Sequence, residues 1–365
     1  MAHHKRWVTC TAGVATVVLG LAGCADAGGD TAKNASAFTK YGAMPAEQRD
    51  PQLAKLAAKE GPIKIYTSFQ DMPKIAAAFQ KKYPGLKTSV YRADSEAVGA
   101  KVQQESQAHR TQADVLETDD VLIQDSVRNK IITDKYKVDP KNMIPGAVHS
   151  GWTAARIKAF LVSWNTKKVP ESEVPHSYQD LANPKWKGKL AIEVGDYQWY
   201  YGLHEYFLKH GMTDAQFTKM FNGIAANARA VKGHTSTTEL LATGEYSIFV
   251  DSYDDGIVAM QEKHAPVTYR DKDGKAAVQP VFTNSTGLGI LSDAPHPAGA
   301  MLFTDFFLSK EGQKIVSDQG NIPARKGVNH ELDGVTTTQA PPATGAASKK
   351  WQDAYAAVLK HAAKG

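Results

Sequence analysis

The chain has 365 residues, 42% of them hydrophobic and 22% charged, which is enough for two lobes with cores of their own and excludes disorder over most of its length. Its formal net charge is +5 at pH 7, and +3 without residues 1–23, whose charged residues are Lys5 and Arg6. A charge this small, without a clustered basic stripe, excludes nucleic acid as a partner. Both cysteines, Cys10 and Cys24, lie near the N-terminus, so the folded part has neither a disulfide framework nor a cysteine metal site.

The first 23 residues have the pattern of a bacterial export signal. A basic start is followed by an apolar run of mostly small residues over 7–21, which is too short for a membrane span. The run ends in Leu21-Ala22-Gly23-Cys24, which resembles a bacterial lipobox. The sequence therefore predicts a lipoprotein signal peptide over residues 1–23.

On this interpretation Cys24 becomes the lipidated first residue of the mature protein. The protein would then lie on the outer face of the bacterial cytoplasmic membrane or in the periplasm, held to the membrane by its lipid anchor. Residues 24–44 are mostly small and polar, and we expect a flexible tether there. An ordinary secretory signal, cut near Ala22 or Ala25, is the alternative.

Strands and helices alternate along the rest of the chain. Short apolar or alternating runs predict strands over 63–67, 88–91, 113–116, 160–164, 189–194, 246–250 and 286–291. Helical spacing of apolar residues predicts helices over 45–60, 73–82, 98–107, 198–209, 214–227, 237–243 and 297–308, and a last helix with Trp351, Tyr355 and Leu359 on one face. This alternation predicts an α/β fold with a mostly parallel sheet.

The polar, proline-containing stretch 165–175 indicates a crossing between two lobes. We predict a discontinuous first lobe of residues 45–163 plus 286–365, on which the last helix docks, and a second lobe of residues 164–285. In such sheets, ligands bind where the carboxyl ends of strands meet helix N-termini. The residues directly after each strand are therefore the candidates for a ligand site in a cleft between the lobes.

Several short runs carry a family resemblance, spread in order over residues 50–330. They are Ala58-Lys59-Glu60-Gly61 with Ile65-Tyr66-Thr67-Ser68, then Pro184-Lys185-Trp186-Lys187-Gly188-Lys189, Gly287-Leu288-Gly289-Ile290, Leu308-Ser309-Lys310-Glu311-Gly312-Gln313 and Asn321-Ile322-Pro323-Ala324-Arg325. Together they resemble the ferric-iron-type extracellular solute-binding proteins of bacterial ABC importers. The resemblance implies a two-lobed periplasmic-binding-protein-like fold with a hinge and an interlobe cleft.

The resemblance also implies a function. The chain would be a lipid-anchored receptor, expected to be a monomer, that captures ferric iron or an iron chelate and delivers it to an ABC permease and its ATPase. Ferric iron would be cargo, held with a synergistic anion, and no resident cofactor is expected. The same role for a cationic organic solute, such as thiamine or a polyamine, is the alternative. An extracellular hydrolase or a sensor-coupled binding protein is the alternative of another class, although the sequence has no serine-nucleophile, phosphate-loop or dinucleotide signature, so no enzyme is expected.

Hydroxyl side chains follow the first two predicted strands of the first lobe. Thr67 and Ser68 come after the first strand and Ser95 after the second, and all three match family positions. They are candidate ligand contacts. Serine and threonine also cap helices, so a plain strand-to-helix turn is the alternative.

Carboxylates gather at later strand ends. Glu117 and Thr118 follow the third strand, and Asp196 and Asp251 occupy similar places in the second lobe. Carboxylates suit a cationic ligand or a hard metal ion. They also favour helix N-termini, which is the alternative role.

Tyr253 is the sharpest test of iron binding. Iron-binding relatives have two adjacent tyrosines here, whereas this chain has Tyr253 followed by Asp254. Tyr253, Asp251 and Glu117 form the candidate metal set, with simple coordination by a tyrosine pair in doubt.

Two further groups are candidates in the second lobe. Four aromatic residues, Tyr197, Trp199, Tyr200 and Tyr201, gather at one helix N-terminus, where such rings can stack on a planar or cationic ligand. Trp199 and Tyr200 are adjacent, so both cannot face one core, and we expect at least one of the four rings to line the cleft. Thr235, in the run Lys232-Gly233-His234-Thr235-Ser236, is a candidate for holding an anionic group or for capping a helix.

Overall fold

The computed structural model describes residues 1, 36–330, 332, 334–340 and 346–364. The predicted signal peptide and Cys24 lie outside the described residues, apart from Met1. Within the described part, no helix has both the length and the apolar character needed to cross a bilayer.

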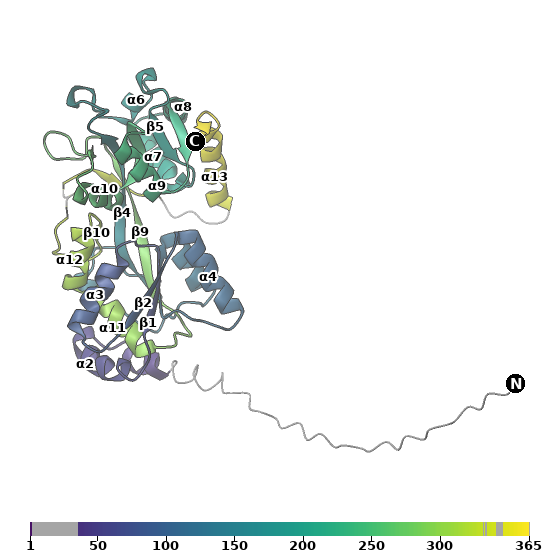
Figure 1. The fold of residues 1–365 in the computed structure, drawn as a ribbon, viewed down its shortest axis with the longest axis vertical. Helices are drawn as coiled ribbons and strands as arrows, with labels where there is room; N and C mark the ends of the chain where they lie inside the picture. The colour runs from purple at the N-terminus through teal and green to yellow at the C-terminus, as the bar shows by residue number, and fades with distance from the viewer. Residues whose placement is uncertain (2–35, 331, 333, 341–345, 365) are drawn as a thin grey trace, which may run out of the picture.

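Figure 1 shows two lobes joined by two long strands, β4 and β9. The first lobe begins with alternating helices and strands, because its apolar residues switch between helical and alternating spacing. Its elements are α2 (Ala46–Ala57), β1 (Ile63–Thr67), α3 (Met72–Lys82), β2 (Thr88–Arg92), α4 (Ser95–Gln107), β3 (Val115–Asp119), α5 (Asp120–Arg128), α11 (Pro297–Phe307), α12 (Lys310–Asp318) and β10 (Ile322–Pro323).

The second lobe repeats the strand-and-helix pattern. Its elements are α6 (Tyr178–Leu181), β5 (Leu190–Glu193), α7 (Tyr197–Lys209), α8 (Asp214–Asn227), β6 (Ala228–Val231), α9 (His234–Thr243), β7 (Ile248–Tyr253), α10 (Asp254–Glu262), β8 (Val267–Thr268), β11 (Thr337–Thr338), α13 (Ala346–Leu359) and β12 (Ala363–Lys364). Short 3-10 turns lie at Pro140–Asn142, Glu171–Glu173 and Pro184–Trp186.

One sheet runs through both lobes, in the main order β12-β6-β5-β7-β4-β9-β3-β1-β2. Strands β1, β2 and β3 pair in parallel in the first lobe, as do β5, β6 and β7 in the second. Strands β4 (Trp152–Asn165) and β9 (Val281–Ile290) cross between the lobes as an antiparallel pair. The carboxyl ends of both parallel sets therefore meet at the crossing.

Strand β4 is much longer than the predicted strand over 160–164. All of its 14 residues are buried, including Arg156 and Lys158. These two cations interrupt the apolar pattern in the sequence, which is why the first half of the strand was missed.

Apolar cores lie on both sides of the crossing. The first-lobe core includes Ile65, Phe79, Phe303 and Phe307. The second lobe has one core under α7 and α8 and another under α9 and α10, on opposite faces of its sheet.

The prediction that the last helix docks on the first lobe is wrong. Helix α13 packs against α7 and α8 of the second lobe (Figure 1), where Tyr355 and Val358 are buried in its core. The helix has one apolar stripe, and that stripe predicts a buried face without specifying the partner.

The predicted tether also ends earlier than expected. Residues 36–41 are helical, and Phe38 and Tyr41 are buried in the first-lobe core. The prediction of a tether over 24–44 is therefore wrong from residue 36 onward. The aromatic side chains of Phe38 and Tyr41 bury enough apolar area to hold this otherwise small and polar stretch on the first lobe.

Candidate functional site

A cavity of about 830 Å³ lies where the two lobes meet, at the carboxyl ends of the parallel strands. We call it the cleft. This volume is within the range of about 300–1,000 Å³ that is usual for small-molecule sites. Both lobes and the crossing strands contribute side chains to its walls.

The first lobe contributes the loops after β1 and β2. Ser68 and Ser95, two of the predicted contacts, line the cleft. Asp94 lies beside them and caps α4, since its Oδ1 accepts the N–H of Ala97 at 2.8 Å. Arg92 is exposed in the cleft, and its guanidinium has no hydrogen-bond or ion-pair partner within the described residues.

Three other predicted contacts lie beneath this wall and do not reach the cleft. Thr67, Glu117 and Thr118 are fully buried. Glu117 Oε2 accepts hydrogen bonds from Thr67 Oγ1 at 2.6 Å and from the N–H groups of Ser68 and Phe69 at 3.1 and 3.0 Å. Its Oε1 lies 3.4 Å from Arg156 Nε. A buried carboxylate needs such donors, so Glu117 braces the loop after β1 from within.

In the second lobe, the loop after β5 leads into α7. Asp196 lines the cleft. Trp199 borders it, but its side chain is fully buried against Phe221 and Tyr355, with ring centroids 5.3 and 6.5 Å away. Tyr200 faces the same core and does not line the cleft. The rings of Trp199 and Tyr200 are therefore not open to a ligand, whereas Tyr197, at the start of the same helix, is half-buried and lines the cleft.

The loop after β6 leads into α9 and is open to the cleft. Gly233 occupies the N-cap position with φ at 94° and provides no side-chain cap, so the first N–H groups of α9 keep no partner from a capping side chain. Thr235 is exposed in the cleft, as predicted for a contact. Lys232 beside it has no side-chain partner within the described part of the chain.

Glu193 joins the two second-lobe loops. Its Oε1 accepts the N–H of Gly233 at 3.1 Å, and its Oε2 accepts the N–H of Gly195. Burial, and then the charge of Asp196, raise the pKa of Glu193 above its usual range. Both oxygens of the Glu193 carboxylate therefore already accept backbone hydrogen bonds and are not free to bind a ligand.

Tyr253 lies in a stack that runs across the cleft floor. Its ring is parallel to that of His234, with centroids 3.5 Å apart and planes 9° apart, and Lys158 Nζ lies 4.6 Å from its centroid. His234 Nε2 lies 2.8 Å from Asp196 Oδ2, and Lys158 donates to Asp119 Oδ1 at 2.6 Å. Charged side chains therefore hold both partners of the tyrosine ring.

Burial, followed by Asp196 and Asp119, raises the pKa of Tyr253 well above its ordinary value. A ferric ion binds a tyrosine as its phenolate, and nearby carboxylates disfavour that form. Burial, with Asp196 and Glu193 nearby, likewise raises the pKa of Asp251, whose oxygens accept the N–H of Glu193 at 3.2 and 3.1 Å. Asp251 is fully buried and does not line the cleft.

The candidate metal set of Tyr253, Asp251 and Glu117 is thus not assembled as a metal site. Two of the three side chains are buried and bound to protein donors. Among the described residues, no group of three or more histidine, cysteine, aspartate or glutamate side chains could hold a metal ion.

Sequence reasoning missed the cations of the crossing strand. Arg156 and Lys158 line the cleft from β4. Burial raises the pKa of Asp119, but the Lys158 ammonium, the Ser95 hydroxyl and the Arg156 guanidinium together bring this pKa below its ordinary value. Two cations at alternate positions within an apolar run share one face of a strand, and that spacing was the available signal.

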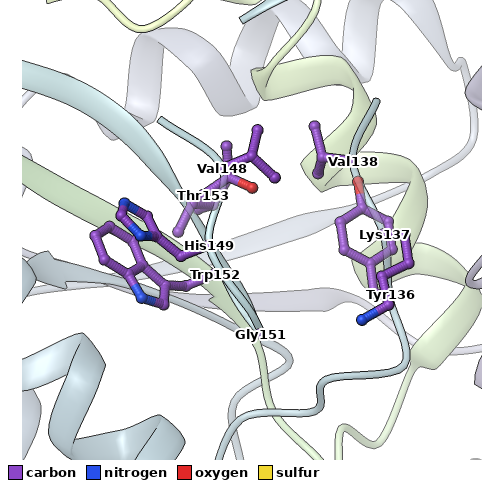
Figure 2. Close-up of a pocket in the computed structure, with 9 residues that line it drawn as sticks. Tyr136, Lys137, Val138, Val148, His149, Gly151, Trp152 and Thr153 are labelled. Carbon is purple, nitrogen blue, oxygen red and sulfur yellow. The ribbon is translucent and has the colours of Figure 1, made fainter. Parts of the chain in front are cut away.

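A second, much smaller pocket lies in the first lobe, at the start of β4. Figure 2 shows His149 beside Trp152, where the rings stack with centroids 3.9 Å apart. The pocket has about 40 Å³, which is room for water and not for an organic solute. Burial lowers the pKa of His149.

Comparisons with known proteins agree with this architecture. The family model described as "Bacterial extracellular solute-binding protein" matches residues 113–347. Iron uptake protein A1 from Synechocystis is 23% identical over 189 residues, which are 48% of this chain and 51% of that protein. The aligned stretch thus spans about half of the relative's length.

Two solved structures share the fold. Iron-bound HitA from Pseudomonas aeruginosa superposes with a TM-score of 0.58 at 19% identity, over 82% of this chain and 98% of that one. AfuA from Actinobacillus pleuropneumoniae, described with exogenous fructose-6-phosphate bound, has a TM-score of 0.61 at 19% identity, over 82% and 97%.

The comparisons confirm the predicted family resemblance and the two-lobed fold. They also confirm that the chain is of a transport type and not an enzyme, since the matched family consists of substrate-binding proteins. The chain belongs to the bacterial extracellular solute-binding proteins.

Proposed function

We propose that the protein is a lipid-anchored receptor of an ABC importer, and that its cleft captures an anionic, oxygen-rich solute, with a ferric chelate as the leading ligand. One observation carries this proposal. In the cleft, the inner carboxylates already have donors from the protein, whereas the side chains of Arg92, Lys232 and Thr235 have no acceptor within the part of the chain that the structure describes.

Four inner carboxylates of the cleft each have a partner, whereas Glu96 and Glu239 line its exposed part without a side-chain partner among the residues that the structure describes. Asp119 pairs with Lys158, Asp196 pairs with His234, and Glu193 binds two backbone N–H groups. Asp255 Oδ2 lies 3.6 Å from Arg156 Nη1. A cationic solute would have to compete with each of these buried or half-buried partners. Thiamine and polyamines are therefore less well supported than an anion.

The unpaired donors are on opposite walls. Arg92 extends from the first lobe, and Lys232 and Thr235 from the second. Closure of the lobes would bring such groups together around one solute, which is the usual motion of this architecture. Charge-assisted hydrogen bonds to an anion are the stronger kind, and arginine can bind a carboxylate through two of them.

A chelate fits better than a bare ferric ion. The cavity is far larger than one ion needs, and two of the three candidate metal ligands, Glu117 and Asp251, are occupied by protein donors. In a ferric chelate, the organic anion supplies most of the oxygen ligands. The receptor then needs to recognise only the outer oxygens of the chelate.

A phosphorylated sugar is the second candidate. The observation in its favour is the uncapped start of α9, with Lys232 and Thr235 at its edge, because helix N-termini with spare N–H groups favour phosphate. A solved neighbour is described with fructose-6-phosphate.

Anchoring and delivery complete the proposal. The lipobox predicts attachment at Cys24, which would keep the receptor beside its permease. Electrophoretic mobility and metabolic labelling with a fatty acid would test the anchor, and Cys24→Ser should abolish the label. A labelled Cys24→Ser protein would contradict it.

The ligand is tested by thermal unfolding of the purified protein after denaturation and refolding to remove bound solute. The probes are ferric citrate, ferric chloride, citrate, inorganic phosphate, a hexose phosphate, thiamine and spermidine. A ligand at 100 times its dissociation constant stabilises by about 2.7 kcal/mol. We expect stabilisation by ferric citrate, and a shift with thiamine or spermidine alone would overturn the anionic class.

Variants make this test specific. Arg92→Gln and Lys232→Gln should each weaken ferric citrate binding by roughly tenfold, because each removes a charge-assisted hydrogen bond. Lys81→Gln is the matched control, since Lys81 is exposed on α3 and does not line the cleft. Equal affinity of all three variants for ferric citrate would remove Arg92 and Lys232 from the site.

A further inference from the structure

The C-terminal segment, residues 346–364, lies along the outside of the second lobe (Figure 1). Helix α13 packs on α7 and α8, and the short strand β12 pairs in parallel with β6. The family match ends at residue 347, so the match assigns almost none of this segment. Its contacts nevertheless converge on the two strands that lead into the second-lobe wall of the cleft.

The first contacts are with the beginning of α7. Tyr197 Oη lies 3.1 Å from Ser348 Oγ, and the ring of Trp351 stacks on Tyr201 with centroids 4.4 Å apart. Tyr355 packs on Tyr200 at 5.5 Å. The aromatic cluster at the start of α7 is therefore a docking face for α13.

A second hydrogen bond links α13 to the base of the cleft. The buried hydroxyl of Tyr355 donates to the backbone oxygen of Glu193 at 2.5 Å. Glu193 is the last residue of β5, and its carboxylate binds the N–H groups of Gly195 and Gly233, one in each cleft loop. Glu193 alone therefore lies between the Tyr355 hydroxyl and the two cleft loops along this chain of hydrogen bonds.

Strand β12 supports the same region from the side. It pairs Ala363 with Arg229 and Lys364 with Ala230, directly before the β6 strand ends at Val231. The loop that follows contains Lys232 and Gly233, lines the cleft and leads into α9.

We propose that the C-terminal segment is a positioning element that holds the loops at 193–197 and 231–235 in the arrangement that binds ligand, and that Tyr355 is its key positioning residue. The link to ligand binding rests on the proposed function of the cleft. The link to loop order rests on the contacts of Tyr355 alone, and it can be tested without any ligand.

Tyr355→Phe is the decisive variant, because it removes one hydroxyl and keeps the ring. Tyr178→Phe is the matched control: Tyr178 is also fully buried in the core under α7 and α8, and its hydroxyl also donates to a backbone oxygen, that of Pro280 at 3.2 Å. Both variants lose one comparable hydrogen bond. Only Tyr355 lies behind the cleft loops.

The measurement is hydrogen–deuterium exchange of the whole protein without ligand. For Tyr355→Phe we expect roughly fivefold faster exchange in peptides that cover residues 193–198, with first-lobe peptides unchanged. For Tyr178→Phe we expect no change in those peptides. Unchanged exchange at 193–198 in Tyr355→Phe, or equal acceleration in both variants, would overturn the proposal.

Ferric citrate provides the second readout. We expect Tyr355→Phe to weaken its binding at least threefold and Tyr178→Phe to leave it unchanged. If the wild-type protein does not bind ferric citrate, the proposed ligand fails while the exchange result still decides the role of Tyr355. Wild-type affinity in Tyr355→Phe together with normal exchange would refute the positioning role and leave the proposed ligand intact.

Discussion

Arg49 and Asp305 form a paired hydrogen bond between α2 and α11, with Arg49 Nε and Nη2 donating to the two carboxylate oxygens at 2.7 and 2.6 Å. Arg49 is buried and also donates to the backbone oxygens of Gly42 and Met44 at 2.9 and 2.8 Å. This one guanidinium therefore holds the N-terminal segment and α2 to the rest of the first lobe.

Asp305→Asn should destabilise the protein by about 3 kcal/mol, because it leaves the buried guanidinium without its counter-ion. Chemical denaturation with urea measures the loss. Asp318→Asn is the control, since Asp318 forms an exposed pair with Lys314 one helical turn away, and it should change stability by less than about 0.5 kcal/mol. Similar effects of the two substitutions would contradict a special role for Arg49 and Asp305.

Asp50 lies beside this pair, and its carboxyl group makes the stability of the protein depend on pH. Burial, and then the Asp305 carboxylate, raise the pKa of Asp50 from 3.8 to about 8. Between about pH 4 and pH 8 the folded state therefore holds a proton that the unfolded chain has lost, so this group makes stability fall as the pH rises through that window.

Asp50→Asn should therefore raise the free energy of unfolding at pH 9, relative to the wild type, by on the order of 1 kcal/mol or more. At pH 4 the substitution should have little effect, because the wild-type side chain is then neutral in the folded state. Urea unfolding at the two pH values measures the difference. A stabilisation that is the same at pH 4 and pH 9 would show that the carboxyl is not titrating in this range.

Glu117→Gln tests whether Glu117 is a brace or a ligand. We expect a loss of about 3 kcal/mol in stability, because the amide can no longer accept from three donors while facing Arg156 as an anion. Glu96→Gln, at the exposed edge of the cleft, is the control and should leave stability unchanged. Intact stability with lost ferric citrate binding would instead make Glu117 a ligand.

Tyr253→Phe separates the ring of Tyr253 from its hydroxyl. The substitution keeps the stack on His234 and the contact with Lys158, so we expect the affinity for ferric citrate to stay within about threefold, or ~0.7 kcal/mol. Isothermal titration measures the affinity, and visible absorption reports any iron–phenolate band. A wild-type band that disappears in the variant, with a large loss of affinity, would establish phenolate coordination.

Gly202→Ala tests the close packing of α7 against the chain before α13. A methyl group at Gly202 would clash with the ring of Phe282 and would lie 2.9 Å from the backbone nitrogen of Ala340. We expect a loss of about 1–3 kcal/mol in thermal or urea unfolding. Gly99→Ala in α4 is the control: its methyl group would meet Leu122 at 3.4 Å, and a helical alanine should be neutral or slightly stabilising.

The sequence was sufficient for the elements whose periodicity is uninterrupted. Strand β1 has the predicted bounds, Ile63–Thr67, and the two isoleucines of its alternating run are both buried. Strand β4 was only partly predicted, because Arg156 and Lys158 lie inside it and pair with distant carboxylates. The partners that make such cations tolerable in a buried strand come from other parts of the chain, so no local pattern reveals them.

The aromatic run of α7 shows the same limit at the site. Tyr197 lines the cleft, as expected for at least one ring of this run, but Trp199 and Tyr200 were the candidate ligand contacts. Both are buried, at 0% and 4% exposure, because α13 covers the side that would otherwise be open. Whether these two rings are buried or face the cleft thus depends on where α13 packs, and α13 is about 150 residues away in the sequence.

Strand β4 has register shifts at two places, between Ala154 and Arg156 and between Leu161 and Ser163. Such bulges increase the local twist of a strand. The segment between them carries Arg156 and Lys158, and it lies at the crossing and not within either lobe. A rotation that closes the lobes about this crossing would leave these two charges near its axis. The ion pairs of Arg156 with Glu117 and of Lys158 with Asp119 would then keep nearly the same geometry at every opening angle, so the receptor could open and close without breaking them.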